Sequence, residues 1–205
     1  MKERPVIFNG EMVRAILDGR KTQTRRVIAN VSPDNCIPLQ KPTKTKDGIY
    51  THVMDAPAHG LCPFGQVGDR LWVRETFAAF DADWKHPGKP HDLRDGPWPN
   101  VVYPASVAKI PDGTCRPSIH MPRWASRILL EITAVRVERL NDISEEDAKA
   151  EGVAPSQHII TPPEALYRVG FLKLWQSIYG EESWRTNPWV WVIEFKQVSA
   201  REVEQ

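Results

Sequence analysis

A basic segment near the start of the chain has the residue types of an anion-binding or nucleophilic site. Its sequence is Gly19-Arg20-Lys21-Thr22-Gln23-Thr24-Arg25-Arg26, and seven Lys and Arg residues against three Asp and Glu residues give positions 1–26 a local charge of +4. Arginine offers a planar fork to phosphate or carboxylate, and lysine offers a point charge. Thr24 becomes a candidate nucleophile if a nearby base or a lysine of lowered pKa activates it. The alternative is a solvated strand edge, since Lys and Arg often protect such edges from pairing.

An acidic segment, residues 141–151, has the opposite charge. Its five acidic residues and one lysine give a local charge of −4. Ser144 is a predicted N-cap, and the acidic residues that follow it are favoured by the helix dipole. Glu151 lies at the C-terminal end of the same predicted helix, where the dipole disfavours a carboxylate. We therefore expect Glu151 to have a partner or a chemical role, although an exposed Glu there would cost only about 0.3–1 kcal/mol.

Aromatic and basic side chains also occur together in two other segments. Trp72, Arg74 and Glu75 belong to an alternating, strand-like run, and the second group is His120-Met121-Pro122-Arg123-Trp124. Aromatic rings beside arginines can stack on bases and contact phosphates. The alternative is that Trp72 and Trp124 belong to the core. Trp72 and Arg74 share one face of a strand, so an inward-pointing Trp72 would leave Arg74 buried and paired, or lining a cavity.

Metal and cofactor motifs are missing from the sequence. The possible metal ligands lack the closely spaced pairs typical of zinc sites; they are Cys36, His52, His59, Cys62 and Cys115. The sequence also lacks a Walker loop and the GxGxxG, HExxH and GxSxG patterns. We therefore predict no metal and no cofactor.

The elements that position these side chains are mostly strands. Strands are predicted near 6–8, 20–28, 71–77, 101–103, 127–140 (with a bulge near Ala134) and 189–195, and helices near 10–18, 144–151 and 162–179. No regular crossover helices link consecutive strands, which argues against a doubly wound parallel sheet. The sequence predicts an α+β, mostly β fold: a small, mostly antiparallel barrel with flanking helices. The 18 prolines among 205 residues are roughly 9%, against a usual ~5%, and most lie in long loops.

Composition restricts the class of protein. The formal net charge is +1, 41% of residues are hydrophobic and 26% are charged, so the chain is not a bulk polycation that coats nucleic acid. No apolar run approaches the ~20 residues of a membrane helix, and the first residues lack the apolar stretch of a signal peptide. Three widely spaced cysteines do not suggest a disulfide framework. We expect a cytoplasmic protein that does not contact a membrane.

Three segments resemble the ASCH domain, a member of the PUA-like superfamily. They are residues 5–26, with a GRKTxTxR pattern, residues 67–77, with a VGDxLWVRE pattern, and residues 188–195. Residues 120–124 look like those of larger, prophage-type members. The resemblance implies a PUA-like small mixed β-barrel of five or six strands, with helices at its mouth and a basic cleft. The implied arrangement is a single domain over 1–198, with long Pro-rich loop insertions near 30–65 and 79–120 and a polar tail at 199–205.

The resemblance also implies a function. ASCH domains are expected to bind RNA or a nucleoside-sized ligand, and one small branch resembles an amidohydrolase that removes the acetyl group from cytidine acetylated on its exocyclic amine. The lysine, threonine and glutamate of that branch correspond to Lys21, Thr24 and Glu151. A buried Lys21 would lose its proton and activate Thr24, and Glu151 would pass the proton to the leaving amine. The residues expected to contact RNA or the nucleoside are Arg20, Arg25, Arg26, Trp72, Arg74, Glu75, His120, Arg123 and Trp124.

Two alternatives stay open. Another branch of the family looks like a ribonuclease, so the same cleft could cleave RNA with a metal ion. The chain could also be a non-catalytic RNA-binding module, whose affinity would fall as salt rises. If the fold brings residues 1–26 and 141–151 together, the net charge of +1 is a sum of opposite local charges that meet at one site.

Overall fold

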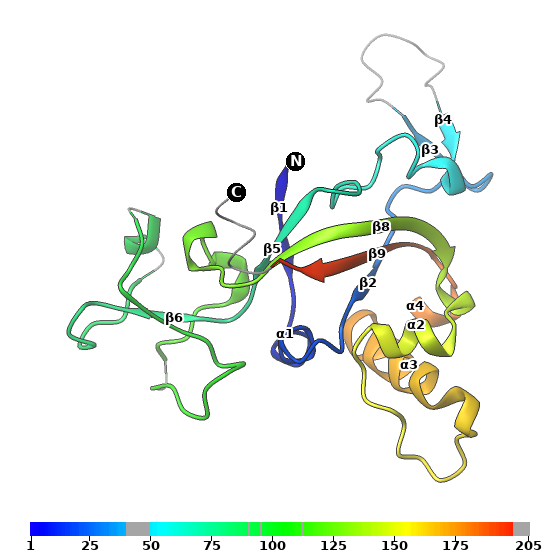
Figure 1. The fold of residues 1–205 in the computed structure, drawn as a ribbon. Coiled ribbons are helices and arrows are strands. Elements are labelled where there is room, and N and C mark those ends of the chain that lie inside the picture. The colour runs from blue at the N-terminus through cyan, green and yellow to red at the C-terminus, as the bar shows by residue number, and fades with distance from the viewer. Residues whose placement is uncertain (40–49, 90, 95, 112, 199–205) are drawn as a thin grey trace.

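The computed structural model describes residues 1–39, 50–89, 91–94, 96–111 and 113–198 (Figure 1). Its central sheet contains, in spatial order, β1 (Glu3–Ile7), β5 (Arg70–Arg74), β8 (Leu129–Arg139), β9 (Trp189–Gln197) and β2 (Gln23–Val27). The β1–β5 pair is parallel and the other pairs are antiparallel. This confirms the predicted α+β, mostly β fold class. The predicted bulge is also confirmed, because the β8–β9 register shifts between Ile132 and Ala134. The predicted tail, 199–205, lies outside the described residues.

The two edge strands of this sheet, β1 and β2, come together without a shared ladder. Among the described residues, the strand order is open between them. Their link is a side-chain hydrogen bond, in which Arg26 Nη2 of β2 donates to the carbonyl oxygen of Ile7 in β1 at 2.7 Å. Figure 1 shows β8 and β9 as long, curved strands. The sheet is therefore an open, curved form of the barrel that the sequence predicts.

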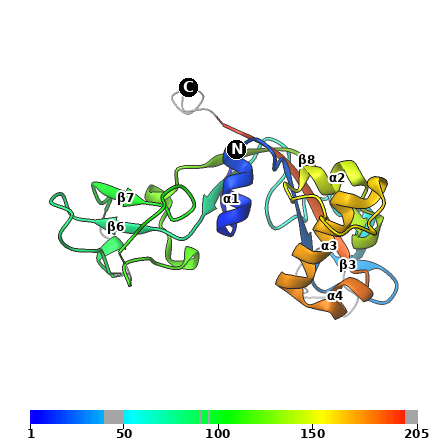
Figure 2. The same cartoon turned by 90° about the horizontal axis from the view of Figure 1, so that it is seen from below.

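The helices lie at the ends and on one side of the sheet. α1 (Gly10–Leu17) connects β1 to β2 and begins at Asn9, whose side chain accepts a hydrogen bond from the Met12 N–H. α2 (Glu145–Ala150), α3 (Leu166–Tyr179) and α4 (Glu181–Arg185) follow β8 and gather beside β8 and β9 (Figure 2). The predicted cap at Ser144 is confirmed, since its side chain accepts a hydrogen bond from the Asp147 N–H.

Two hairpins stand outside the five-stranded sheet, one in each region that resembles an insertion. β3 (Cys36–Pro38) pairs with β4 (Tyr50–His52), and β6 (Ala78–Phe80) pairs with β7 (Asn100–Val102). Residues 40–49, which join β3 to β4, lie outside the described part of the chain. Short 3₁₀ turns occur at Val53–Asp55, Asp92–Arg94, Ser118–His120, Arg123–Ala125, Leu140–Asp142 and Pro163–Ala165.

The β6–β7 hairpin belongs to a lobe, residues 77–126, that has its own small core. In Figure 2 this lobe lies on one side of α1, and α2, α3 and α4 lie on the other side. The buried residues of the lobe are Phe77, Ala79, Leu93, Met121 and Ala125. The lobe therefore packs largely on itself, apart from the core that positions the basic segment.

Two hydrophobic clusters surround the basic segment. The larger cluster lies within the curve of the sheet and includes Phe8, and the smaller one packs α2 and α3 against β9 and includes Phe171. Lys21 Nζ lies 5.5 Å from the centre of the Phe8 ring, and Arg25 Cζ lies 5.9 Å from the centre of the Phe171 ring. The fold thus inserts two cations between two apolar cores, where charge needs a partner.

Candidate active site

The backbone around Lys21 is tied to the ends of two helices. The Lys21 N–H donates to the carbonyl oxygen of Ala15 in α1 at 2.9 Å, and the Thr22 N–H donates to that of Ala150 in α2 at 2.8 Å. A single antiparallel bridge pairs Lys21 with Glu151. The fold therefore brings the basic and the acidic segments of the sequence together at one point.

Gly152 makes this close approach sterically possible. It follows Glu151, the C-cap residue of α2, and has a φ of +78°. A Cβ atom at this position would lie 2.6 Å from Lys21 Cβ and 2.8 Å from Ala15 Cβ. Both distances are shorter than van der Waals contact, and a positive φ also disfavours any residue with a side chain. A glycine here lets α2 end directly against Lys21.

Lys21 and Glu151 form a buried ion pair. Their side chains are 0% and 3% exposed, and Lys21 Nζ lies 2.7 Å from Glu151 Oε2. Lys21 Nζ also donates to the carbonyl oxygens of Gln23, at 2.8 Å, and of Glu151, at 2.9 Å. Burial lowers the pKa of the Lys21 amine below its usual value, while the Glu151 carboxylate acts in the opposite direction. The expectation that Glu151 needs a partner is thus met by a lysine 130 residues away.

Arg25 holds the second oxygen of the same carboxylate. Its side chain is 0% exposed, and its Nη1 lies 3.3 Å from Glu151 Oε1. Its Nη2 lies 3.0 Å from Glu138 Oε2 and 3.1 Å from Asp147 Oδ2. Arg136 of β8 binds Glu138 and Asp147 from the other side. Arg25 was predicted to contact a ligand, but in the structure its guanidinium is engaged by three carboxylates of the chain itself.

Thr24 occupies the opposite face of β2. Adjacent strand residues alternate between faces, so Thr24 and Arg26 point away from Arg25. Thr24 is buried, and no hydrogen bond of its hydroxyl group is found among the described residues. It lines a narrow recess of about 20 Å³ together with Glu151, both neighbouring arginines (Arg25 and Arg26) and aromatic side chains of α3. Thr24, the predicted nucleophile, and Glu151, the predicted proton carrier, therefore line the same recess, although no hydrogen bond joins them among the described residues.

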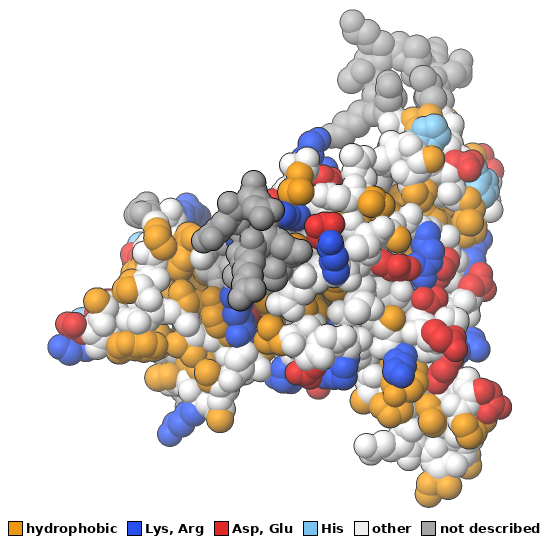
Figure 3. Space-filling model, viewed as in Figure 1, with side chains coloured by type: hydrophobic (Ala, Val, Ile, Leu, Met, Phe, Trp, Pro, Cys, Tyr) orange, Lys and Arg blue, Asp and Glu red, His pale blue; other side chains and the backbone are white. Residues whose placement is uncertain are grey.

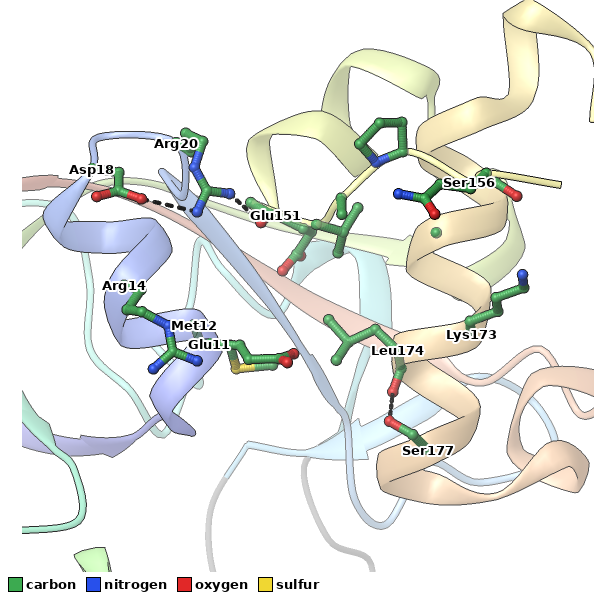
Figure 4. Close-up of a pocket in the computed structure, with 16 residues that line it drawn as sticks. Glu11, Met12, Arg14, Asp18, Arg20, Glu151, Ser156, Lys173, Leu174 and Ser177 are labelled. Atoms are coloured by element: carbon green, nitrogen blue, oxygen red, sulfur yellow. Dashed lines mark hydrogen bonds and ion pairs between the residues drawn. The ribbon is translucent and has the colours of Figure 1, made fainter. Parts of the chain in front are cut away.

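A larger cleft opens beside this recess, between α1 and α3 (Figure 4). Its volume is about 690 Å³, within the usual range for small-molecule sites. Figure 4 shows Glu151 between Arg14 of α1 and Leu174 of α3. The cleft and the recess share Met12, Glu151 and Leu174. Three basic side chains line the cleft (Arg14, Arg20 and Lys173), and three acidic ones (Glu11, Asp18 and Glu151). Their charges balance, so the cleft is not the basic cleft that the resemblance implies.

Two other predicted ligand residues flank this region. Arg20 lines the cleft, is about half exposed, and bonds to Asp18 and to the carbonyl oxygen of Gly152 at 3.0 Å. Arg26 lies against the rings of Phe8 and Phe64 and lines the recess. Its Nε is buried and has no hydrogen-bond partner among the described residues. Arg26 therefore keeps one donor free beside Thr24.

Trp72, Arg74 and Glu75 do not belong to this cleft. Leu71 and Val73 are the buried residues of β5, so Trp72 and Arg74 lie on the outer face of the sheet. The prediction that Trp72 belongs to the core is therefore wrong, because Leu71 and Val73, and not Trp72, occupy the buried face of β5. Arg74 lies over the Trp72 ring, at 5.5 Å, and donates to the carbonyl oxygen of Ile119. Glu75 is buried in a two-point ion pair with Arg127, at 2.8 and 3.0 Å.

His120 and Trp124 line a separate hollow of about 350 Å³, together with Ile119, whose carbonyl oxygen accepts a hydrogen bond from Arg74. The indole N–H of Trp124 donates to the carbonyl oxygen of Leu93, so Trp124 packs partly into the core of the lobe. Arg123 pairs with Glu3 at 2.8 Å, and His120 is exposed at the rim. The predicted ligand residues thus divide into two groups, one at the α1–α3 cleft and one at the junction of sheet and lobe.

Sequence reasoning missed the ion network behind Glu151. Arg136 and Glu138 lie two positions apart on β8 and share a face, which is an available signal for paired charges. Asp147 was assigned only to the first turn of its helix, but it also binds Arg25 and Arg136. Within the described ranges, no group of three or more His, Cys, Asp or Glu side chains is arranged to hold a metal ion. No helix of the described chain is long and apolar enough to cross a membrane.

Comparisons with known proteins add one likeness. No protein-family model matches the chain, and no curated protein matches it. Among solved structures, the chain is similar to an ASCH domain from Lactobacillus crispatus JV V101, with 13% sequence identity and a TM-score of 0.41, over 96% of this chain and 79% of that chain. At this level of identity and overlap, the site has to be understood from its own contacts.

Proposed function

We propose that this chain is an ASCH-like hydrolase that binds a nucleoside acylated on an exocyclic amine, such as acetylcytidine, and removes the acyl group. The main supporting observation is the position of Glu151. Its carboxylate is buried against Lys21 at 2.7 Å, and it lines both the 690 Å³ cleft and the recess that contains Thr24. A substrate in the cleft would therefore contact Glu151 directly and reach Thr24 through the recess, with Lys21 buried behind Glu151.

Charge favours a nucleoside over a long RNA strand in this cleft. The lining has three basic and three acidic side chains, whereas a groove that follows RNA is positively charged. Figure 3 shows acidic and basic side chains interspersed on the visible face, without a broad basic area. The recess holds about one water-sized volume, so the base and sugar would occupy the cleft and only the acyl end would point to Thr24.

The proposed chemistry begins with a proton transfer inside the ion pair. All three N–H groups of Lys21 donate hydrogen bonds, so Lys21 can act as a base only after one proton passes to Glu151 Oε2. Burial lowers the pKa of Lys21 and favours this transfer. The neutral amine then turns its lone pair from Glu151 toward Thr24 and accepts the hydroxyl proton while Thr24 Oγ1 bonds to the acyl carbon. Glu151 gives its proton to the leaving amine as the C–N bond breaks, and water hydrolyses the resulting ester.

A deacetylation assay with acetylcytidine tests this proposal. We expect the wild type to release acetate and cytidine, and Thr24→Val to lose this activity, because the nucleophile is removed with little change in volume. Thr22→Val is the matched control, since Thr22 is exposed two residues earlier in the same segment and should retain the wild-type rate. The proposal fails if the wild type releases no acetate, or if Thr24→Val and wild type release it equally fast.

The second candidate is RNA binding at the junction of sheet and lobe. Arg74 lies over the Trp72 ring and binds the carbonyl oxygen of Ile119, and the next residue, His120, lines the 350 Å³ hollow. Arg123 adds a further basic side chain nearby in the chain. RNA affinity should fall as salt rises and should decrease in Arg74→Ala, without cleavage of the RNA. Affinity that is indifferent to salt would argue against this function. The same titration with Mn²⁺ and with a chelator also tests the ribonuclease alternative, which no feature of the described residues favours.

A further inference from the structure

Arg25 has contacts that ligand binding does not explain. Its buried guanidinium reaches Asp147 in the first turn of α2, Glu151 at the end of α2, and Glu138 on β8. Asp147 and Glu151 are four residues apart, so their carboxylates lie on one face of the helix and repel each other. A cation between them offsets this repulsion. Arg25 therefore connects both ends of α2 to β2.

The face of β2 that carries Arg25 also binds the backbone of α2. Gln23 lies on the same strand face, and its Nε2 donates to the carbonyl oxygen of Asp147 at 2.7 Å. Lys21 reaches the Glu151 carboxylate from the same direction. The carboxylate is thus held by two cations, Lys21 on Oε2 and Arg25 on Oε1.

We propose that Arg25 is a positioning residue, which holds Glu151 Oε1 so that Oε2 stays on Lys21. The proposal rests on the proposed function for its catalytic meaning, because the Lys21–Glu151 pair is where that hydrolysis begins. It makes a separate claim about the pair itself, which can be measured without substrate.

Arg136 supplies a matched control for this role. Like Arg25, it is a guanidinium bound to Glu138 and Asp147, with a further contact to Glu194 of β9. Unlike Arg25, it makes no ion pair with Glu151 among the described residues. Removal of either arginine takes one positive charge from the same cluster, but only the loss of Arg25 frees Glu151 Oε1.

The surroundings of Lys21 fix the direction of the expected change. The charged groups that face it are Glu151 from the end of α2, and Arg26 and Arg25 from β2. Arg25 is itself faced by Glu138 of β8, Asp147 of α2 and Glu151. Burial is the largest cause of the lowered pKa of Lys21, and the two arginine charges lower it further. Arg25 also holds near Lys21 the carboxylate that raises this pKa. Arg25→Lys keeps the charge and loses the fork, so if Glu151 then moves off Lys21, the pKa of Lys21 should fall.

The experiment compares Arg25→Met, Arg25→Lys and Arg136→Met with the wild type. The first measurement is acetylcytidine hydrolysis across pH. We expect both Arg25 variants to lower kcat by about 10²-fold, because small displacements of a reacting group have effects of that size, with KM changed only a few-fold. In Arg25→Lys the acidic limb should move to lower pH, because Lys21 loses the carboxylate that keeps it protonated. Arg136→Met should keep a pH profile close to that of the wild type. Arg25→Lys keeps the charge without the planar fork, so it tests the geometry in a chain that is easier to fold.

The second measurement is the titration of the Lys21 ammonium by ¹⁵N NMR, assigned through its proximity to the Phe8 ring. We expect a shift to lower pH in Arg25→Lys and none of similar size in Arg136→Met. An unchanged or higher titration in Arg25→Lys, or a shift of equal size in Arg136→Met, would overturn the positioning role. If the wild type shows no hydrolysis, the proposed function fails. The Lys21 titration then still decides whether Arg25 keeps Glu151 Oε2 on Lys21.

Discussion

Replacement of Gly152 by alanine tests how the candidate site is assembled. The new Cβ would lie 2.6 Å from Lys21 Cβ, 2.8 Å from Ala15 Cβ and 3.1 Å from Lys21 Cα. These neighbours are a backbone atom and the first atoms of side chains, so none can move aside by a simple rotation. The φ of +78° adds strain of its own, about 1–2 kcal/mol for an L-residue. Overpacking against fixed neighbours costs about 1–3 kcal/mol more.

Gly19 provides the matched control. It follows the C-cap residue of α1 in the way that Gly152 follows that of α2, and its φ is +72°. A Cβ at Gly19 would meet nothing within 4 Å. Gly19→Ala should therefore carry only the backbone strain, about 1–2 kcal/mol. The difference between the two variants isolates the steric contact with Lys21.

Urea and thermal unfolding measure these effects. We expect Gly152→Ala to lower the free energy of unfolding by about 2–5 kcal/mol, which for a chain of this size is a decrease of roughly 4–20 °C in Tm. Gly19→Ala should fall at or below the lower end of that range. Equal destabilisation by the two variants would refute the close approach of α2 to Lys21. Acetylcytidine hydrolysis should also decrease in Gly152→Ala alone, because only this change displaces Lys21.

Three further predictions concern the same region. Lys21→Met should destabilise the chain by about 3–5 kcal/mol in urea, because it leaves a buried carboxylate unpaired; addition of Glu151→Gln should recover part of the loss, and no recovery would contradict the pairing. Although burial raises the pKa of the Asp147 carboxyl, nearby arginine charges hold it below its usual value, so its contribution should be present above about pH 4 and be lost as pH falls further. Asp147→Asn should then destabilise the chain more at pH 7 than at pH 3 in urea titrations, and an equal loss at both would contradict this. Gly170→Ala should lower Tm, although alanine favours helices by about 1 kcal/mol, because its Cβ would lie 2.2 Å from the carbonyl oxygen of Ala154; an increase in Tm would show that the segment moves away.

Local physical rules were enough for several features of the fold. The cap at Ser144 and the bulge near Ala134 follow from residue type and from a slip in alternation, and both are present. The unusual position of Glu151 at a helix C-terminus was also visible in the sequence, because the helix dipole acts within one turn. Such features depend on neighbours that are a few residues away.

The roles of Arg25 and Trp72 could not be predicted in this way. Arg25 looks like a free phosphate ligand beside Arg26, yet its partners lie 113 to 126 residues further along the chain. Trp72 alternates with Leu71 and Val73, and only the packing of the sheet decides which of the two faces is buried. The balanced charge of the α1–α3 cleft is likewise a sum over distant segments.

The sequence by itself determined which groups could do chemistry: a lysine, a threonine and an acidic residue in two oppositely charged segments. It also determined the class of fold, because strand alternation and helix caps are local properties. Only the tertiary structure decided that Lys21 and Glu151 meet in a buried pair, that Arg25 contacts the second oxygen of the same carboxylate, and that a cleft of about 690 Å³ opens beside it. The physical reason is that burial makes each charge depend on partners from other elements, and the fold alone brings those partners together.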